Sequence, residues 1–258
     1  MDFKRIFLSP IYTIYENNLK KEILKGSLPQ HIGIILDGNR RGAIARGLPV
    51  EAGYELGSKK LEEVLDWVWE LEVKVISVWI FSTENFTRDE DQVSTIMKMA
   101  EEKTIQIRED SKIHSRQVQI RYSGDRNLLH ESLKEQIDET EAVTENYNKY
   151  ILNVCLAYGG RAEITAATKK IASLVQNGKL TIDQIDEDLI TEHLYTNGLP
   201  DPDLIIRTSG QARLSGFLMW QSTYSELFFT DVLWPNFRKI DLYRAVRDFQ
   251  GRKRNFGK

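Results

Sequence analysis

Asp37 is the residue of this chain whose surroundings most clearly suggest chemistry. It ends a run of β-forming residues, and Gly38, Asn39, Arg40 and Arg41 follow it directly. A carboxylate binds a hard divalent cation, whereas arginine side chains and the backbone amides that open a helix favour phosphate oxygens. The glycine lets the backbone turn tightly and pass close to a ligand. The segment therefore predicts a site for a divalent cation and a diphosphate.

A simpler interpretation of this segment remains open at this point. Asp37 would cap the helix that follows, and both arginines would be solvated, as most arginines are. Three further polar clusters bear on the choice, because each of them follows a predicted strand. These clusters are Ser82, Thr83, Glu84, Asn85, Phe86, Thr87 and Arg88; Tyr158, Gly159, Gly160 and Arg161; and Arg207, Thr208, Ser209 and Gly210, with Arg213 and Ser215 just beyond.

The elements that would position these residues alternate between strands and helices. Strand-like runs cover residues 31–36, 73–81, 118–123, 150–157, 204–208 and 227–230. Helical patterns cover residues 53–72, 91–112, 126–149, 161–176 and 187–196. Several of the strands are almost wholly apolar, as strands covered on both faces are. We predict an α/β fold with a central, mostly parallel six-stranded sheet flanked by helices.

Such a sheet would bring the four clusters to one rim, because ligands of open α/β sheets bind beyond the carboxyl ends of the strands. Five arginines would then converge there: Arg40, Arg41, Arg88, Arg207 and Arg213. One arginine alone is a weak signal, but five at a shared rim favour a polyanionic substrate, which we interpret as two diphosphates.

Composition limits the other classes of function. The chain has 258 residues, 41% of them hydrophobic, and a net charge of −3, so no global field attracts nucleic acid and we expect no nucleic-acid partner. The single cysteine, Cys155, excludes an internal disulfide and a cysteine-rich zinc site. No apolar run approaches the roughly 20 residues that span a bilayer.

The N-terminus carries apolar residues at near-helical spacing: Phe3, Ile6, Phe7, Ile11, Ile14, Tyr15 and Leu19. Such a helix lies at a membrane interface or, more often, packs on its own domain. We therefore divide the chain into an N-terminal helical extension, residues 1–30, and a catalytic domain, residues 31–258. A cytoplasmic location is expected. Peripheral membrane contact, through this helix or through the product, stays open at this point.

In their order and spacing, the clusters resemble the cis-prenyltransferase family of the undecaprenyl diphosphate synthase type. The resemblance covers about residues 31–257 and rests on the motifs at residues 31–41, 81–88, 207–210, 213–215, 217–221 and 224–229. It implies a homodimeric α/β enzyme with magnesium as cofactor and a hydrophobic tunnel. Such an enzyme condenses isopentenyl diphosphate with an allylic diphosphate to give a cis-prenyl or polyprenyl diphosphate.

The resemblance also implies roles for individual residues. Asp37 would bind Mg²⁺ and assist departure of the allylic diphosphate, Glu226 would be the second magnesium carboxylate, and Asn85 would aid proton removal or orientation. The backbone of Gly38, Asn39 and Arg40, with the Arg41 side chain, would cradle the allylic diphosphate. The diphosphate of isopentenyl diphosphate would be held by Arg88, Arg207, Arg213 and Ser215. The remaining substrate-binding positions would be Ser82, Thr83, Glu84, Phe86 and Leu214.

Five positions depart from the family pattern. Gly42 stands where relatives usually carry a large aromatic residue, Val50 where many carry an arginine, and Tyr54 where a histidine is usual. Gln211 replaces a common glutamate, and Asn255 replaces a further arginine near the C-terminus. Loss of an arginine contact at Val50 would weaken a charge-assisted bond by roughly 1.5–3 kcal/mol, unless Arg46 or Arg254 compensates. Space at Gly42 would admit a different substrate shape.

These departures leave two alternatives beside the leading hypothesis. One is an atypical coupling on the same fold, either non-head-to-tail or short-chain. The other is a non-catalytic prenyltransferase subunit, which the presence of both Asp37 and Arg41 argues against. Product length and primer stay undetermined at this stage, since residues 93–100 either line a tunnel or belong to the ordinary core.

Overall fold

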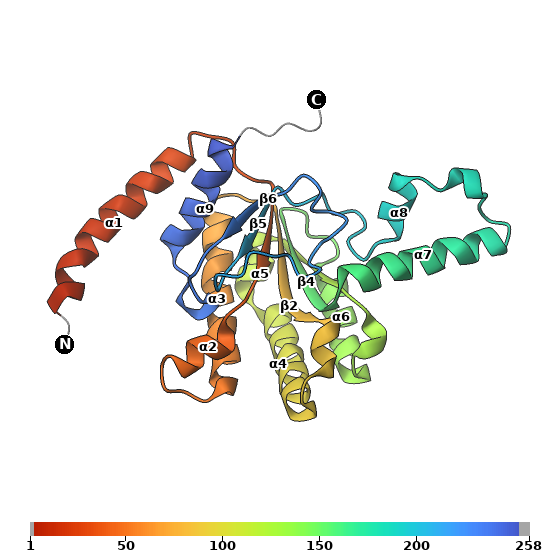
Figure 1. Cartoon of the computed structure of the whole chain (residues 1–258), viewed down its shortest axis with the longest axis horizontal. Coiled ribbons are helices and arrows are strands. Elements are labelled where there is room, and N and C mark those ends of the chain that lie inside the picture. Colours follow the sequence, from red (N-terminus) through yellow and green to blue (C-terminus); the bar gives the residue numbers. More distant parts are fainter. Residues whose placement is uncertain (1–2, 253–258) are drawn as a thin grey trace.

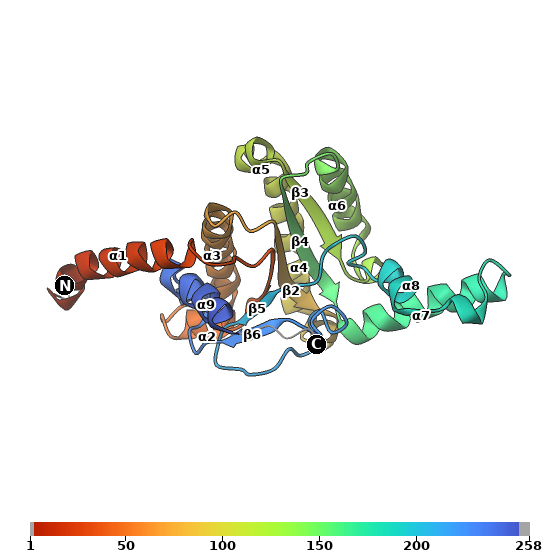
Figure 2. The same cartoon turned by 90° about the horizontal axis from the view of Figure 1, so that it is seen from above.

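The computed structural model of the chain describes residues 3–252, with side chains from Tyr12 onward. At its centre lies a six-stranded sheet in the order β3-β4-β2-β1-β5-β6, in which all adjacent pairs are parallel (Figures 1 and 2). The strands are β1 His31–Ile35, β2 Val75–Ser82, β3 Val118–Ser123, β4 Tyr150–Tyr158, β5 Leu204–Arg207 and β6 Glu226–Phe229. The predicted α/β fold with six strands is therefore confirmed, and the sheet is wholly parallel.

The helices follow the predicted alternation, with three differences. They are α1 Phe3–Ile23, α2 Asn39–Ile44, α3 Val50–Glu70, α4 Glu90–Glu109, α5 Ser111–Arg116, α6 Glu131–Thr144, α7 Gly160–Gln176, α8 Glu187–His193 and α9 Lys239–Gly251. The single helix predicted over 91–112 is interrupted because Asp110 is extended, and its carboxylate caps α5 by accepting from the Lys112 amide at 2.8 Å. The helix predicted over 126–149 begins only at Glu131. The sequence analysis missed α9, although its buried Leu242, Val246 and Phe249 recur at helical spacing.

The two faces of the sheet have different cores, because successive strand residues point to opposite sides. On one face, Ile34, Val78 and Val154 belong to a large cluster that also holds buried residues of α3, α4, α6 and α9. On the other face, Ile35 and Cys155 join a small cluster, which a long loop after β5 completes with Phe217 and Leu218. Phe217 lies so close to β1 that a Cβ on Gly33 would stand 3.0 Å from its ring.

A row of buried polar side chains crosses four adjacent strands. The Nδ1 atom of His31 on β1 lies 2.7 Å from the Pro200 carbonyl oxygen, which can only accept, so Nδ1–H donates and Nε2 accepts from the Ser77 hydroxyl at 2.8 Å. Asn153 on β4 donates to Ser77 Oγ at 2.9 Å and accepts from Ser123 Oγ on β3 at 2.7 Å. Donors and acceptors therefore match along the whole row.

His31 is expected to make the protein less stable in mild acid. Burial lowers the pKa of this histidine from 6.5 to about 4, so the folded state binds its proton less readily than the unfolded chain does. The contribution of His31 to the free energy of unfolding should therefore be fully present above pH 6.5. The free energy of unfolding should fall by about 3 kcal/mol as the pH drops to 4. Urea unfolding across this range measures the effect. The His31→Gln variant should show a flatter dependence, and an identical slope in both proteins would contradict the assignment.

Helices extend away from the sheet on its two opposite sides. Figures 1 and 2 show α1 on one side, beside α9, and α7 with α8 extending from the opposite side. Near its C-terminal end, α1 buries Leu19 and Ile23. Of the seven apolar residues on which the idea of membrane contact rested, the side chains of Phe3, Ile6, Phe7 and Ile11 lie outside the described residues, whereas Ile14 and Tyr15 are exposed. Among the helices that the structure describes, none has the length and apolar character needed to cross a bilayer.

Candidate active site

A cavity of about 1460 Å³ opens at the carboxyl ends of β1, β2, β4 and β5, where the four polar clusters were predicted to meet. Its lining includes Asp37, Asn85, Arg161 and Arg207, one residue from each cluster. Pockets for ordinary small ligands measure about 300–1,000 Å³. The cavity therefore suits a larger ligand, and the predicted convergence at one rim is confirmed.

Gly38 sets the turn that delivers Asp37 and the two arginines after it. Its φ of 105° lies in the left-handed region, and a Cβ there would come within 2.9 Å of the Leu233 side chain. Any other residue would be strained and would collide with Leu233. Helix α2 begins directly afterwards at Asn39, as the sequence predicted.

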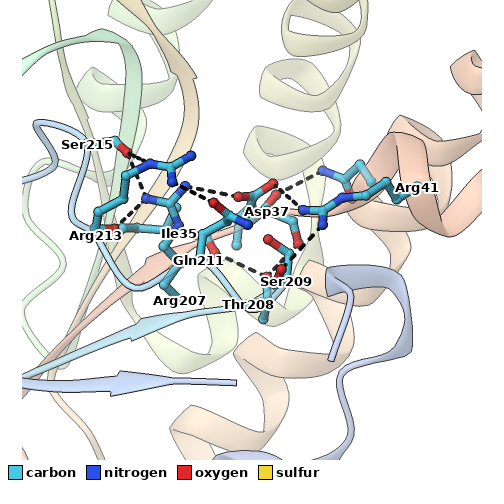
Figure 3. A network of polar contacts seen from close by, with 11 residues as sticks. Ile35, Asp37, Arg41, Arg207, Thr208, Ser209, Gln211, Arg213 and Ser215 are labelled. Atoms are coloured by element: carbon cyan, nitrogen blue, oxygen red, sulfur yellow. Dashed lines mark hydrogen bonds and ion pairs between the residues drawn. The ribbon is translucent and has the colours of Figure 1, made fainter. Parts of the chain in front are cut away.

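The Asp37 carboxylate lies between two guanidinium groups (Figure 3). One oxygen is 3.0 Å from Arg207 Nη2 and the other is 3.5 Å from Arg41 Nη2. Burial favours the neutral acid, but Arg207, with smaller contributions from Ser209 and Arg41, outweighs it and lowers the pKa of Asp37. The backbone is fixed as well, since the Asp37 carbonyl accepts from Thr208 Oγ1 at 2.6 Å. Asp37 is thus a positioned carboxylate that stays ionised at neutral pH.

Arg207 is the centre of the polar network in Figure 3. Only 5% of the residue is exposed, and besides Asp37 it binds the Arg213 carbonyl and, at 2.8 Å, Ser215 Oγ. Its Nε has no partner within the described part of the chain. The Arg213 side chain donates to Ser215 Oγ at 3.2 Å and to Gln211 Oε1 at 2.5 Å. Because Gln211 is neutral, this contact leaves the positive charge of Arg213 unneutralised.

A second group of donors follows β2. The Ser82 hydroxyl caps the 3₁₀ turn Thr83–Thr87. It accepts from the backbone N–H of Asn85 at 3.2 Å and from the side-chain Nδ2 of Asn85 at 2.7 Å. Arg88 lies over the Phe81 ring, 5.8 Å from its centroid. Burial and the nearby charge of Arg40 lower the pKa of Arg88. Two like charges held close together in a concave site favour binding of an anion between them.

Not every residue that the resemblance assigned to substrate reaches the cavity. Ser82, Glu84, Leu214 and Ser215 line it together with Gly38, Asn39, Arg40 and Arg41. Thr83 and Phe86 are absent from the lining: the Thr83 hydroxyl packs against Gly159, and the Phe86 and Phe81 rings make a T-shaped contact with their centroids 5.0 Å apart. The assignment of these two residues to substrate stays a prediction.

Glu226 lies at the amino ends of the parallel strands, whereas Asp37 lies at their carboxyl ends. Glu226 is the first residue of β6 and pairs with Leu204, whereas Arg207 pairs with Phe229 at the far end of the same two strands. Its carboxylate binds Arg252 Nη1 at 2.7 Å and does not line the cavity. Within one chain, Glu226 is therefore not a second metal carboxylate beside Asp37. No group of three or more acidic, histidine or cysteine side chains suited to a metal occurs among the described residues.

The departures from the family pattern have different structural settings. Gly42 is buried against Pro235, where a Cβ would stand 3.0 Å from the proline ring, so it opens no space in the cavity. Val50 and Tyr54 do line the cavity, and the Tyr54 hydroxyl lies beside the Arg88 guanidinium group. Arg46 does not line the cavity and binds Asn236 Oδ1 at 2.6 Å. Asn255 and Arg254 lie outside the described residues.

The other end of the cavity is mainly apolar, although Glu62 and Lys103, which pair at 3.0 Å, also line it. It extends between α3 and α4 and is lined there by Leu61, Leu65, Ile96, Met99, Ala100 and Ile107. Thr104 and Tyr122, joined by a 2.9 Å hydrogen bond, also belong to this lining. Of the segment 93–100, three residues line the cavity, while Met97 is buried in the core. The α3 residues were missed, because apolar residues facing a cavity have the same sequence pattern as residues facing a core.

Known proteins match this chain over nearly its whole length. The family described as "Putative undecaprenyl diphosphate synthase" matches residues 35–257. A geranylgeranyl-diphosphate-specific tritrans,polycis-undecaprenyl-diphosphate synthase of Pyrococcus horikoshii is 48% identical, with 98% of this chain and 96% of the relative covered. An isoprenyl transferase of Thermus thermophilus is 46% identical, with 96% of each chain covered.

Among solved structures, lavandulyl diphosphate synthase from Lavandula x intermedia, in complex with dimethylallyl diphosphate, superimposes with a TM-score of 0.85. It is 34% identical, with 90% of this chain and 99% of that chain covered. The parallel sheet, the charged cavity rim and these matches define a prenyltransferase, an enzyme that builds prenyl diphosphates. The chain belongs to the cis-prenyltransferase family of the undecaprenyl diphosphate synthase type.

Proposed function

We propose that the protein is a magnesium-dependent cis-prenyltransferase that extends an allylic diphosphate with isopentenyl diphosphate and makes a polyprenyl diphosphate. The observation that carries this proposal is the single cavity whose rim holds cationic donors and whose interior is apolar. The rim suits the two diphosphates, and the interior suits a hydrocarbon chain that grows while its diphosphate stays at the rim.

The rim residues divide between the two substrates by position. Arg40, Arg41 and the backbone of residues 38–40 hold the allylic diphosphate next to Asp37. Arg213 and Ser215, with Arg207 behind them, hold the diphosphate of isopentenyl diphosphate. The resting contacts of Arg207 and Arg213 with each other and with Ser215 pre-orient these donors, so little ordering remains to be done when substrate binds.

The donor set at Asp37 fits a magnesium ion. Magnesium in such enzymes is usually held by one or two carboxylates together with substrate phosphates and waters, and Asp37 is an ionised carboxylate beside the proposed diphosphate site. When bound, the ion would help to neutralise the charge that develops on the leaving diphosphate. Arg41 would stabilise the same charge from the protein side.

The remaining chemistry is carbon–carbon bond formation. The allylic carbon–oxygen bond breaks, the double bond of isopentenyl diphosphate attacks that carbon, and a proton leaves the new chain. Asn85 is held by Ser82 and orients the reacting group, since an amide is a poor base. The proton passes to a diphosphate oxygen or to Asp37. The lowered pKa of Asp37 keeps its carboxylate ionised before the reaction, so that it is free to accept, but it also makes Asp37 a weaker base.

We further propose a geranylgeranyl diphosphate primer, a hydrophobic tunnel formed by the apolar part of the cavity, and a homodimer. The primer follows the name of the relative from Pyrococcus horikoshii. The homodimer follows from the family resemblance, and a partner subunit is the remaining way to bring Glu226 near a second site. Peripheral membrane contact, through the product or α1, and the two-part domain division also stay as proposals.

The test is incubation of the purified protein with labelled isopentenyl diphosphate, magnesium and a panel of allylic diphosphates from five to twenty carbons, followed by mass spectrometry. We expect chain extension, most efficient with the longest primer. Failure to extend any primer would contradict the proposal, and extension by the isolated protein would exclude the role of non-catalytic subunit.

A second candidate is an atypical coupling of prenyl diphosphates on the same fold. It is supported by the likeness to lavandulyl diphosphate synthase and by the changed rim positions Val50 and Tyr54. Product NMR separates the two candidates, because the position of the new bond and the geometry of the double bond differ.

The apolar end of the cavity should set product length. The Ala100→Leu variant adds bulk between α3 and α4, so we expect a product distribution shortened by one or more isoprene units with the rate of the first addition unchanged. Mass spectrometry of the products measures this. Ala172→Leu, at an exposed position on α7, is the matched control and should leave the distribution as it is. An unshifted distribution for Ala100→Leu would mean that the chain does not pass this point.

A further inference from the structure

The apolar part of the cavity lies between one side of α3 and one side of α4. On α3, the residues that line it recur at every third or fourth position from Tyr54 to Leu65, and on α4 they do the same from Gln92 to Ile107. Such spacing marks a single side of a helix. We call the strip where these two sides face each other the seam. Along the seam, each helix borders the cavity where it would otherwise pack against its neighbour.

One ion pair crosses the seam. Lys103 Nζ on α4 lies 3.0 Å from Glu62 Oε1 on α3, and both residues line the cavity. Within residues 12–252, no other hydrogen bond or ion pair joins these two helices. The closure of the seam by polar contacts therefore depends on this single pair.

The pair stands at the border between the cavity and the solvent. Glu62 lies on the charged outer side of α3, between Lys59 and Asp66, neither of which lines the cavity. The Glu62 side chain is 63% exposed and the Lys103 side chain is 30% exposed. A lysine in such a place lays its aliphatic stem along apolar neighbours while its ammonium group reaches water. The pair thus closes the wall of the cavity at the surface of the protein.

This closure is a weak one. An ion pair with so much exposure shifts an equilibrium by no more than about fivefold. Apolar side chains at the same two positions would close the wall more firmly, because burial would hold each of them in place. A weak polar contact beside an apolar cavity is suited to a wall that opens while both helices stay folded.

The product of the proposed reaction needs such an opening. Its diphosphate lies at the rim, but its hydrocarbon chain lies in the interior of the cavity. Departure through the rim alone would draw the whole chain past the arginines into water, where each exposed methylene group makes the step about fourfold less favourable. A chain that leaves sideways through the seam passes directly into an apolar acceptor.

We propose that the seam is the exit port for the hydrocarbon chain of the product, with the Glu62–Lys103 pair as its latch and a phospholipid bilayer as the acceptor. This inference rests on the proposed function, because only a long apolar product needs the route. No covalent step is involved: the ion pair separates, the chain moves out between α3 and α4, and the diphosphate leaves from the rim.

A crosslink across the seam tests the proposal. In the protein with both Glu62→Cys and Lys103→Cys, a short cleavable bis-maleimide joins the two new thiols, since the one native cysteine, Cys155, is buried. Labelled product is first built on the protein, the crosslink is then closed, and transfer of the label to phosphatidylcholine vesicles is followed. We expect transfer to be at least about tenfold slower than before crosslinking, because release waits for the port to open. Cleavage of the crosslink should restore the original rate.

The Lys103→Met variant should have the opposite effect. It keeps an unbranched side chain but removes the latch, so we expect the same transfer to become faster, by up to about fivefold. Lys103 is the better partner to replace, because its charge also reaches Glu55 on α3: Lys59 and, more weakly, Lys103 lower the pKa of Glu55. Without Glu62, Lys103 would keep an acidic group across the seam.

The matched control carries Asp66→Cys and Lys112→Cys. These residues form a 2.8 Å ion pair that joins α3 to α5, and neither lines the cavity. The same crosslink there should leave transfer unchanged. Unchanged transfer with the seam crosslinked would mean that the chain leaves by the rim, and it would overturn the proposal, as would equal slowing by both crosslinks. A wild-type protein that extends no primer would instead contradict the proposed function.

Discussion

Asp37→Asn is expected to reduce kcat about 10³-fold, the upper range for removing one preorganised electrostatic group from an active site. The amide keeps the shape of the side chain but loses the charge that would hold a magnesium ion and that now pairs with Arg207 and Arg41. The loss should appear equally in kcat and kcat/KM, since the charge acts while the diphosphate departs. Steady-state assays with labelled isopentenyl diphosphate over a range of magnesium concentrations measure it.

The control for this variant is Asp66→Asn, which removes a carboxylate paired with Lys112 and Arg116 on the surface, away from the cavity. It should retain full activity. If Asp37→Asn kept its activity within about tenfold of the original, Asp37 would serve only to hold the side chains of Arg207 and Arg41 in place.

Arg207→Met is expected to damage both stability and activity. The guanidinium group is almost fully buried and joins Asp37, the Arg213 carbonyl and Ser215. Removing one partner of a buried ion pair costs about 3–5 kcal/mol. We expect about 3 kcal/mol here, because the Asp37 side chain is 30% exposed and water replaces part of the contact. Activity should fall at least about 10²-fold, since the donors for both diphosphates lose their alignment.

Chemical unfolding and steady-state assays at a temperature where the variant is folded separate these two effects. Arg126→Met, which breaks surface ion pairs with Asp138 and Glu141, is the control and should cost less than about 1 kcal/mol with no loss of activity. An Arg207→Met protein with normal activity would show that the network in Figure 3 does not align the donors.

The sequence predicted the rim of the cavity well, because it depends on local patterns. Each strand run ends at a polar residue, and parallel strands end at a common edge, so Asp37, Asn85 and Arg207 had to be close. The same reasoning, applied fully, would have separated Glu226 from Asp37 within one chain. A residue that precedes a strand of a parallel sheet lies at the amino edge, and the strand predicted at 227–230 already placed it there.

Side-chain direction was the part that the sequence could not supply. Thr83 and Phe86 stand in the same motif as Asn85, but of the three only Asn85 lines the cavity. Gly42 is explained by Pro235, which is distant in sequence, and no local pattern predicts that contact. The apolar end of the cavity depends on a gap between α3 and α4, and residues beside a gap and residues in a core are equally apolar.

The buried polar row from His31 to Ser123 has a consequence for how this sheet assembles. Strands that are apolar on both faces carry little information about which residue should face which, so they can slide past one another. Each hydrogen bond of the row is satisfied in one alignment only, and a slip of one residue would leave several polar groups buried and unpaired. Because β1 and β2 end at the same edge of the sheet, Asp37 lies level with the donors that follow β2. The polar row lines no part of the cavity, and yet it fixes the alignment of the strands on which the active site depends.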